Sequence, residues 1–123
     1  MKIKTSEAER EVLDWLVARC EDEEVTMIKG QLETRWTENG WKPSTEWAQG
    51  GPIIEREGMD LNPHGVDSSN GRTHWRAAIQ WLDESDFEGI GPTPLIAAMR
   101  CYVASKLGDE VEVPDELTML GER

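Results

Sequence analysis

The chain has 123 residues, a hydrophobic fraction of 37% and a formal net charge of -12. One hydrophobic core commonly organises roughly 100 to 150 residues, so we expect a single domain over residues 1–123. No stretch approaches the roughly 20 apolar residues of a membrane span, and residues 1–10 turn charged where a signal peptide would be apolar. We therefore expect a cytoplasmic protein with no membrane partner.

The acidic residues are concentrated at the two ends of the chain. The net charge is -4 over residues 1–24, -1 over residues 25–82 and -7 over residues 83–123, and five of the six tryptophans lie in the nearly neutral middle block. Affinity for a nucleic-acid backbone comes mainly from basic residues that neutralise phosphates. The pattern therefore disfavours direct backbone binding, and a site for a small anionic ligand should draw on the middle block.

The first expected helix covers residues 7–21. Ser6 and Glu9 have the spacing of a capping box, and apolar side chains recur after them at the spacing of one buried helical face. Residues 1–5 form either an edge strand or a leader to this helix.

Residues 24–42 predict a hairpin insertion flanked by tryptophans. Weak strand character precedes a turn at residues 38–40, which lies between Trp36 and Trp41. A domain this small has difficulty burying six tryptophans, and exposed aromatic patches usually mark interfaces. We expect Trp36 and Trp41 to form the interface of a homo-oligomer, a dimer or larger; the alternative is that both rings close over the core.

The second helical segment is expected over residues 45–57, with Ser44 or Thr45 as its cap. Gly50, Gly51 and Pro52 interrupt the helical pattern, because glycine is a poor helix former and proline lacks an amide donor. The segment should therefore form two short helical pieces or one kinked helix.

The remaining pattern alternates strands and turns before a last helix. Residues 58–62 predict a brief strand, residues 63–72 a loop, residues 73–82 a strand of clean alternation, and residues 83–91 a turn.

The last helix is expected over residues 94–107, and a short strand over residues 110–113 follows it. Thr93 is its cap, Pro94 takes the first helical position, and Gly108 is expected to end it in the left-handed conformation. The order of elements predicts an α+β fold, in which a small antiparallel sheet packs with about three helices, similar to an α-β-α sandwich.

Motifs for catalysis and metal binding are missing from the sequence. His64 and His74 have no nucleophile motif beside them, and the sequence contains neither a glycine-rich dinucleotide motif nor a Walker pattern. Cys20 and Cys101 lack metal-ligand spacing and are expected as free thiols, with a disulfide between helices as the alternative. We therefore expect a protein that is not an enzyme and that has no catalytic residues, metal or cofactor.

The segment from Ser44 to Gly51 is the best candidate for a ligand site. A tryptophan offers a stacking face, glycine amides allow close approach, and neighbouring polar side chains can donate hydrogen bonds. Arginines and the amides at a helix start can hold an anion. The alternative is a capped helix with a tight packing point, Trp47 in the core and arginines in surface salt bridges. The expected ligand-binding residues are Ser44, Thr45, Trp47, Gln49, Gly50, Gly51, Arg56, Arg76, Thr93 and Arg100.

Three segments resemble the NinX family, small accessory proteins of lambdoid and related enterobacterial phages. They are residues 47–57, residues 75–77 and residues 91–114, whereas residues 24–42 correspond least. A weaker similarity links the element pattern to the phage α-β-α sandwich domain. The resemblance implies a phage origin and early, non-essential expression, and it carries over no catalytic residues.

Two function hypotheses follow. The first is a non-catalytic phage accessory protein that binds and sequesters a small, anionic, nucleotide-like signalling ligand of the host, a counter-defence role. The alternative is an acidic protein-protein inhibitor of a host nucleic-acid-binding or defence protein. The step from a phage accessory protein to counter-defence is an analogy and not a consequence of any residue.

Overall fold

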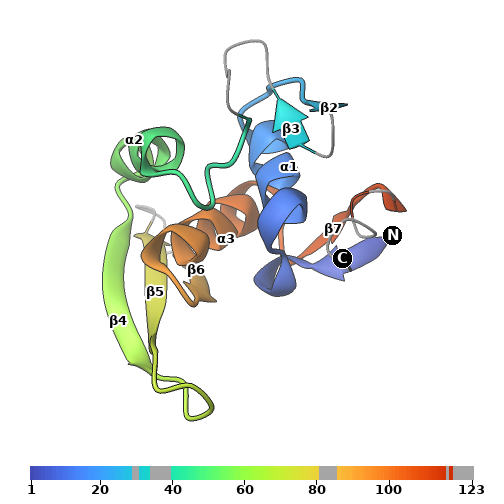
Figure 1. Ribbon diagram of the computed structural model, residues 1–123. Helices are drawn as coiled ribbons and strands as arrows, with labels where there is room; N and C mark the ends of the chain where they lie inside the picture. Colours follow the sequence, from blue (N-terminus) through green and yellow to red (C-terminus); the bar gives the residue numbers. More distant parts are fainter. Residues whose placement is uncertain (29–30, 34–39, 81–85, 116, 118–123) are drawn as a thin grey trace.

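The computed structural model describes residues 1–28, 31–33, 40–80, 86–115 and 117. Helix α3 (Pro94–Leu107) lies at its centre and contacts the strands β5 and β6 and the helices α1 and α2 (Figure 1). A helix that is apolar on most of its circumference must be buried on most of its circumference. The buried residues of α3 are Leu95, Ala97, Ala98, Met99, Cys101, Tyr102 and Val103.

The ends of α3 largely follow the sequence prediction. The Thr93 hydroxyl oxygen accepts a hydrogen bond from the Ile96 amide at 3.1 Å, so Thr93 is the cap. Gly108 has a φ of 91°, but its ψ of -173° lies outside the left-handed helical region. The predicted helix is therefore confirmed. Gly108 ends it with a positive φ, which favours glycine, but not in the predicted left-handed helical conformation, and Asp109 then leads into strand β7 (Glu110–Glu112).

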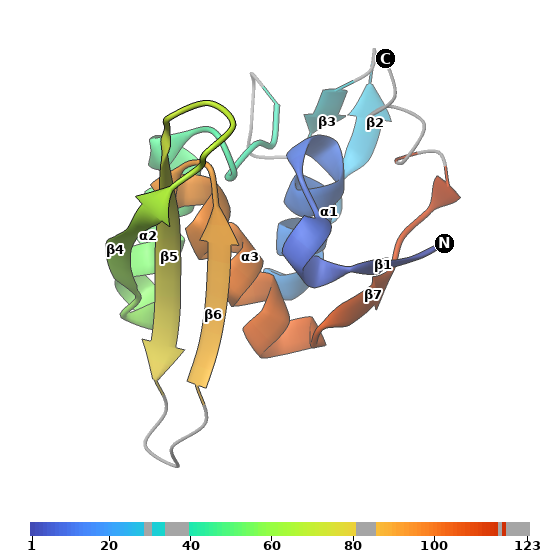
Figure 2. The same cartoon turned by 90° about the horizontal axis from the view of Figure 1, so that it is seen from below.

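A three-stranded antiparallel sheet covers one side of α3. Its strands are β4 (Asp60–Val66), β5 (Thr73–Gln80) and β6 (Asp86–Gly91), with β5 in the middle. Ala77 and Ile79 of β5 are buried against the core, as the alternating pattern predicts. In Figure 2 the helices lie on one side of this sheet, with α3 between the sheet and α1.

Two strand predictions were wrong because tertiary contacts replace local propensity. β4 extends to Val66, into the expected loop, since it pairs along β5 with an irregular register after Pro63. β6 lies where a turn was expected. Gly89 of β6 is so close to α3 that an added Cβ would be 2.5 Å from the Cys101 amide nitrogen. The glycines that resemble turn residues in the sequence are therefore sites of close strand–helix packing.

Helix α1 (Arg10–Cys20) begins later than expected. A 3-10 turn, η1 (Thr5–Glu7), precedes it, and its cap residue Glu9 makes no side-chain capping bond, so the predicted capping box of Ser6 is wrong. The Thr5 amide donates to the Asp109 carbonyl at 2.8 Å, and the Thr5 hydroxyl donates to the Gly108 carbonyl at 2.6 Å. These bonds to the far end of the chain hold residues 5–7 apart from the helix.

The two short sheets stand beside α1. Strand β1 (Lys2–Lys4) pairs with β7, which confirms the edge-strand reading of residues 1–5. Strands β2 (Thr26–Ile28) and β3 (Gln31–Glu33) pair antiparallel within residues 24–42, and most of the turn expected at residues 38–40 falls outside the described residues. Trp36 and residues 34–39 lie outside the described residues.

Helix α2 (Trp47–Glu57) is continuous through Pro52. Pro52 and Ala48 are both exposed, so water can hydrate the carbonyl that would otherwise accept the missing amide proton. The cap residue is Glu46, without a side-chain capping bond, and the predicted caps Ser44 and Thr45 are wrong. Three helices with small antiparallel sheets confirm the α+β class. No helix among the described residues is long and apolar enough to cross a membrane.

Candidate functional site

The loop of residues 40–46, which leads into α2, is fixed by two side chains. The Gln49 side chain accepts a hydrogen bond from the Lys42 amide at 2.7 Å and donates one to the Gly40 carbonyl at 2.9 Å. On the other side, the Ser44 amide donates to Asp14 Oδ1 at 2.8 Å. Ser44 is fully buried. Ser44 and Gln49, both expected as ligand contacts, therefore lie where they shape this loop.

A pocket of about 270 Å³, which we call the Trp41 pocket, lies between this loop and α1. The Trp41 indole N–H donates to the Asp14 carbonyl at 2.8 Å, and the half-buried ring packs against the core. The ring is therefore held rigidly at the pocket wall. The described residues that line the pocket are Arg10, Glu11, Asp14, Leu32, Gly40, Trp41, Lys42 and Thr45.

Asp14 is a buried carboxyl group in this pocket, with only 5% of its surface exposed. Burial raises its pKa to about 7, and the hydrogen bond that the Ser44 amide donates opposes part of that rise. Near neutral pH the Asp14 carboxyl is therefore present in both the protonated and the ionised form, and it can donate or accept a hydrogen bond.

Two basic residues stand at the same pocket. Arg10 and Lys42 line it, and neither forms a salt bridge with a carboxylate of the described part of the chain. Arg10 has a φ of 54°, a left-handed backbone that is uncommon for residues other than glycine. Because Asp14 is only partly ionised, the two bases are opposed mainly by Glu11, and the pocket can accept a negative group.

Trp47, Gly50 and Gly51 have different surroundings. Trp47 is 54% exposed, so it is neither core nor a lining residue of the Trp41 pocket. A Cβ at Gly50 would lie 2.5 Å from Leu95 Cδ1, so Gly50 is the tight packing point between α2 and α3. A Cβ at Gly51 would meet only the Trp47 ring, at 4.0 Å.

Arg56, near the carboxyl end of α2, forms hydrogen bonds and ion pairs with several side chains of the same chain. It contacts the Glu21 carboxylate at 2.7 Å and Glu57 at 3.0 Å, and it donates to the Tyr102 hydroxyl at 3.1 Å. The Tyr102 hydroxyl in turn donates to Glu21. The hydrogen bond with Glu21 raises the pKa of Arg56. This network joins α1, α2 and α3, which is the structural role of Arg56.

Arg76 and Thr93 also have partners within the chain. Arg76 Nε contacts Glu88 at 2.8 Å across β5 and β6, and the Thr93 side chain caps α3. Among the described residues, neither side chain lines the Trp41 pocket or forms a hydrogen bond or ion pair with Trp47.

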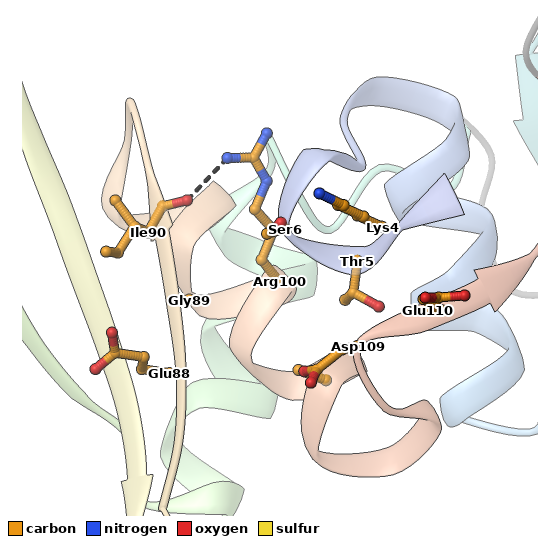
Figure 3. Close-up of a pocket in the computed structure, with 10 residues that line it drawn as sticks. Lys4, Thr5, Ser6, Glu88, Gly89, Ile90, Arg100, Asp109 and Glu110 are labelled. Atoms are coloured by element: carbon orange, nitrogen blue, oxygen red, sulfur yellow. Dashed lines mark hydrogen bonds between the residues drawn. The ribbon is translucent and has the colours of Figure 1, made fainter. Parts of the chain in front are cut away.

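Arg100 lines a second, larger cavity of about 470 Å³, which we call the Arg100 groove (Figure 3). Its Nε donates to the Ala8 carbonyl and its Nη1 to the Ile90 carbonyl, both at 2.8 Å. Burial lowers the pKa of Arg100, and its guanidinium forms no salt bridge with a described carboxylate. The described lining residues are Lys4, Thr5, Ser6, Glu88, Gly89, Ile90, Arg100, Ala104, Asp109 and Glu110.

Sequence reasoning missed Asp14, Arg10 and Lys42 as site residues. A signal for Asp14 was present, since it precedes the buried Val17 and Ala18 by three and four residues and so shares their helical face. A carboxyl group on a buried helical face is unusual. Lys42 and Arg10 gave no such signal, because only the fold brings the start of α1 to the loop before α2.

The described residues give little support for metal binding or for a cysteine nucleophile. No three His, Cys, Asp or Glu side chains among them gather closely enough to hold a metal ion. Cys20 and Cys101 are both free, which confirms the predicted thiols, and burial raises the pKa of each to about 12. A thiol with such a raised pKa is a poor nucleophile.

The fold defines a small α+β protein with two surface cavities among its described residues. The family model described as Bacteriophage P22, NinX matches residues 4–106. The chain therefore belongs to the NinX family, a family of phage accessory proteins that is not known as enzymatic. A comparison with curated proteins found no match.

Proposed function

We propose that this NinX-family protein is a non-catalytic binder that sequesters a small, anionic, nucleotide-like molecule of the infected host, in the host cytoplasm, as a counter-defence. The observation that carries the proposal is the composition of the Trp41 pocket. A rigid indole ring, two bases without a described carboxylate partner and a buried carboxyl group meet in one preformed cavity.

Each of these groups matches a part of a nucleotide. An indole ring stacks on a base, and loss of such stacking costs roughly 1 to 3 kcal/mol per base. Lys42 and Arg10 can neutralise a phosphate, while Asp14 can hydrogen-bond to the polar edge of a base in either protonation state. Thr45 adds a hydroxyl group at the rim. The Gln49 and Ser44 bonds keep this arrangement in place before a ligand arrives.

The size of the pocket limits the ligand. Pockets for drug-sized ligands commonly measure roughly 300 to 1,000 Å³. A cavity of about 270 Å³ favours one ring system with one acidic group over a dinucleotide. We therefore expect a mononucleotide-like ligand, cyclic or linear.

Isothermal titration calorimetry with a panel of linear and cyclic nucleoside monophosphates tests the proposal. Trp41→Leu and Lys42→Ala should each weaken binding of the preferred nucleotide, Trp41→Leu by roughly 5- to 150-fold from the loss of stacking. Trp47→Leu is the matched control, because this tryptophan is exposed and outside the pocket. Circular dichroism of each variant verifies that the fold is intact.

Three outcomes would count against the proposal. The binder hypothesis fails if no nucleotide of the panel binds, and the site is wrong if Trp47→Leu weakens binding as much as Trp41→Leu. Chromatography of the recovered ligand addresses catalysis: a chemically altered nucleotide would show that the protein is an enzyme.

A further inference from the structure

Strand β6 has a free edge that faces the Arg100 groove. Among the described strands, β6 pairs with β5 on one side only. In Figure 3 the Ile90 carbonyl points away from β5, toward Arg100. In an antiparallel pair, a residue directs both its N–H and its C=O either to the partner strand or away from it, and the direction alternates along the strand. Ile90 and Glu88 therefore present their backbone groups to the groove.

The groove beside this edge has two walls and a floor. β6 forms one wall, residues 4–6 together with Asp109 and Glu110 form the other, and Arg100 of α3 lies between them (Figure 3). Arg100 reaches from the Ala8 carbonyl to the Ile90 carbonyl, so its side chain closes the groove at the Ile90 end. The open volume lies along Ile90, Gly89 and Glu88.

Charges in the groove are separated along its length. In Figure 3, Arg100 and Lys4 lie toward the Ile90 end, whereas Asp109 lies toward the opposite end; the Glu88 side chain points to the other side of β6, where it pairs with Arg76. The lining contains no aromatic residue among the described positions. A nucleotide would lack a stacking surface here and would meet the carboxylates of Asp109 and Glu110, so this groove suits a different ligand from the Trp41 pocket.

We propose that the Arg100 groove binds an extended peptide segment of a protein partner, which adds a strand to the free edge of β6. Main-chain hydrogen bonds to the Glu88 backbone groups and to the Ile90 amide provide the affinity, as in other cases of strand addition, since the Ile90 carbonyl already accepts from Arg100. Charge complementarity selects the segment: an acidic residue meets Arg100 and Lys4, and a basic residue meets Asp109. This inference does not depend on the proposed nucleotide site, since the two cavities share no lining residue.

The probes are five-residue peptides with blocked termini, whose three central residues are apolar residues and threonine. One carries lysine first and aspartate last, a second has the reverse order, and a third carries glutamine and asparagine in place of the charges. Nuclear magnetic resonance titration of the full chain measures binding and locates it. At least one charged peptide should shift the amides of residues 88–90, and the neutral peptide should bind more weakly. The order of charges that binds tells the direction of the added strand.

Variants and a modified peptide separate strand addition from general charge attraction. Methylation of alternate peptide amides leaves the protein unchanged. It should abolish binding when the methylated amides are those that face β6, and not when they are the amides that point away from β6. Arg100→Gln should weaken binding roughly tenfold or more, since a hydrogen bond to a charged group is lost. Lys4→Ala should weaken it roughly two- to fivefold. Lys2→Ala is the control, because Lys2 lies on the same strand but does not line the groove.

The proposal is overturned if none of the peptides shifts the amides of residues 88–90, or if methylation weakens binding in neither of the two registers. It is also overturned if inorganic phosphate or a nucleotide produces the same shifts as the charged peptide, because the groove would then be an anion site. Should Arg100→Gln unfold the chain, the methylated peptides and Lys4→Ala still decide the question.

Discussion

Substitution of the buried Asp14 should change how the stability of the protein depends on pH. Its carboxyl group has a folded pKa of about 7 against an ordinary value of 3.8, because burial disfavours the charged form. The folded state therefore binds the proton more tightly than the unfolded state does. Stability that depends on this proton is complete below about pH 4, falls as the pH rises, and is lost once the pH passes the folded pKa.

The size of the effect follows from the two pKa values. One pKa unit corresponds to about 1.4 kcal/mol, so ionisation of buried Asp14 removes on the order of 4 kcal/mol from the free energy of unfolding above pH 7. Between pH 5 and pH 8 the loss is roughly 2 to 3 kcal/mol. Asp14→Asn removes the titration, while its side-chain oxygen can still accept the hydrogen bond that the Ser44 amide donates.

Urea unfolding at pH 5 and pH 8, followed by circular dichroism, measures this prediction. The wild-type protein should lose more stability than Asp14→Asn over this interval, by roughly 2 to 3 kcal/mol. Glu11→Gln removes a carboxylate from the same turn of α1 but from a less buried position, and it serves as the control. Parallel losses in the wild type and in Asp14→Asn would refute the reasoning that burial perturbs this carboxyl group.

Three further predictions concern packing, capping and the side-chain network. Gly50→Ala should destabilise the fold by roughly 1 to 3 kcal/mol, because the added Cβ would clash with the Pro43 backbone carbonyl as well as with the Leu95 side chain. The adjacent Gly51→Ala should be neutral or stabilising by up to about 1 kcal/mol, and a shift of the same sign in both thermal unfolding curves would contradict the packing role. Thr93→Ala should cost about 1 kcal/mol in urea unfolding from loss of the α3 cap, and an unchanged midpoint would show that the bond contributes nothing. Arg56→Met should lower the midpoint temperature of thermal unfolding, because it leaves a partly buried Glu21 carboxylate without its basic partner. The double variant with Glu21→Gln should recover part of that loss.

The predicted self-association through Trp36 and Trp41 stays a prediction. Trp41 packs against the core and forms the wall of a pocket, while Trp36 lies outside the described residues. Sedimentation over a range of concentrations checks the prediction, and a monomer at all concentrations would exclude it.

Local patterns were sufficient for the elements whose neighbours in space are also neighbours in sequence. The helix after Thr93 followed from its cap, from proline at the first helical position and from its apolar composition, and the strand at residues 73–80 followed from its alternation. The α+β class and the NinX family assignment followed from the same segments. In each case the information lies within a few residues, so the sequence alone was enough.

Only the tertiary structure decided which groups share a site. Gly50 and Gly51 are chemically identical neighbours, but a Cβ at Gly50 would clash with Pro43 and Leu95, whereas a Cβ at Gly51 would meet only the Trp47 ring, at 4.0 Å. The expected ligand residues are dispersed, because Arg56 pairs with Glu21 and Gln49 holds a loop. The Trp41 pocket exists because α1 packs against the loop before α2, which brings together residues about thirty positions apart. Long-range packing of this kind leaves no periodic pattern, and so sequence reasoning found the tryptophans but not the pocket.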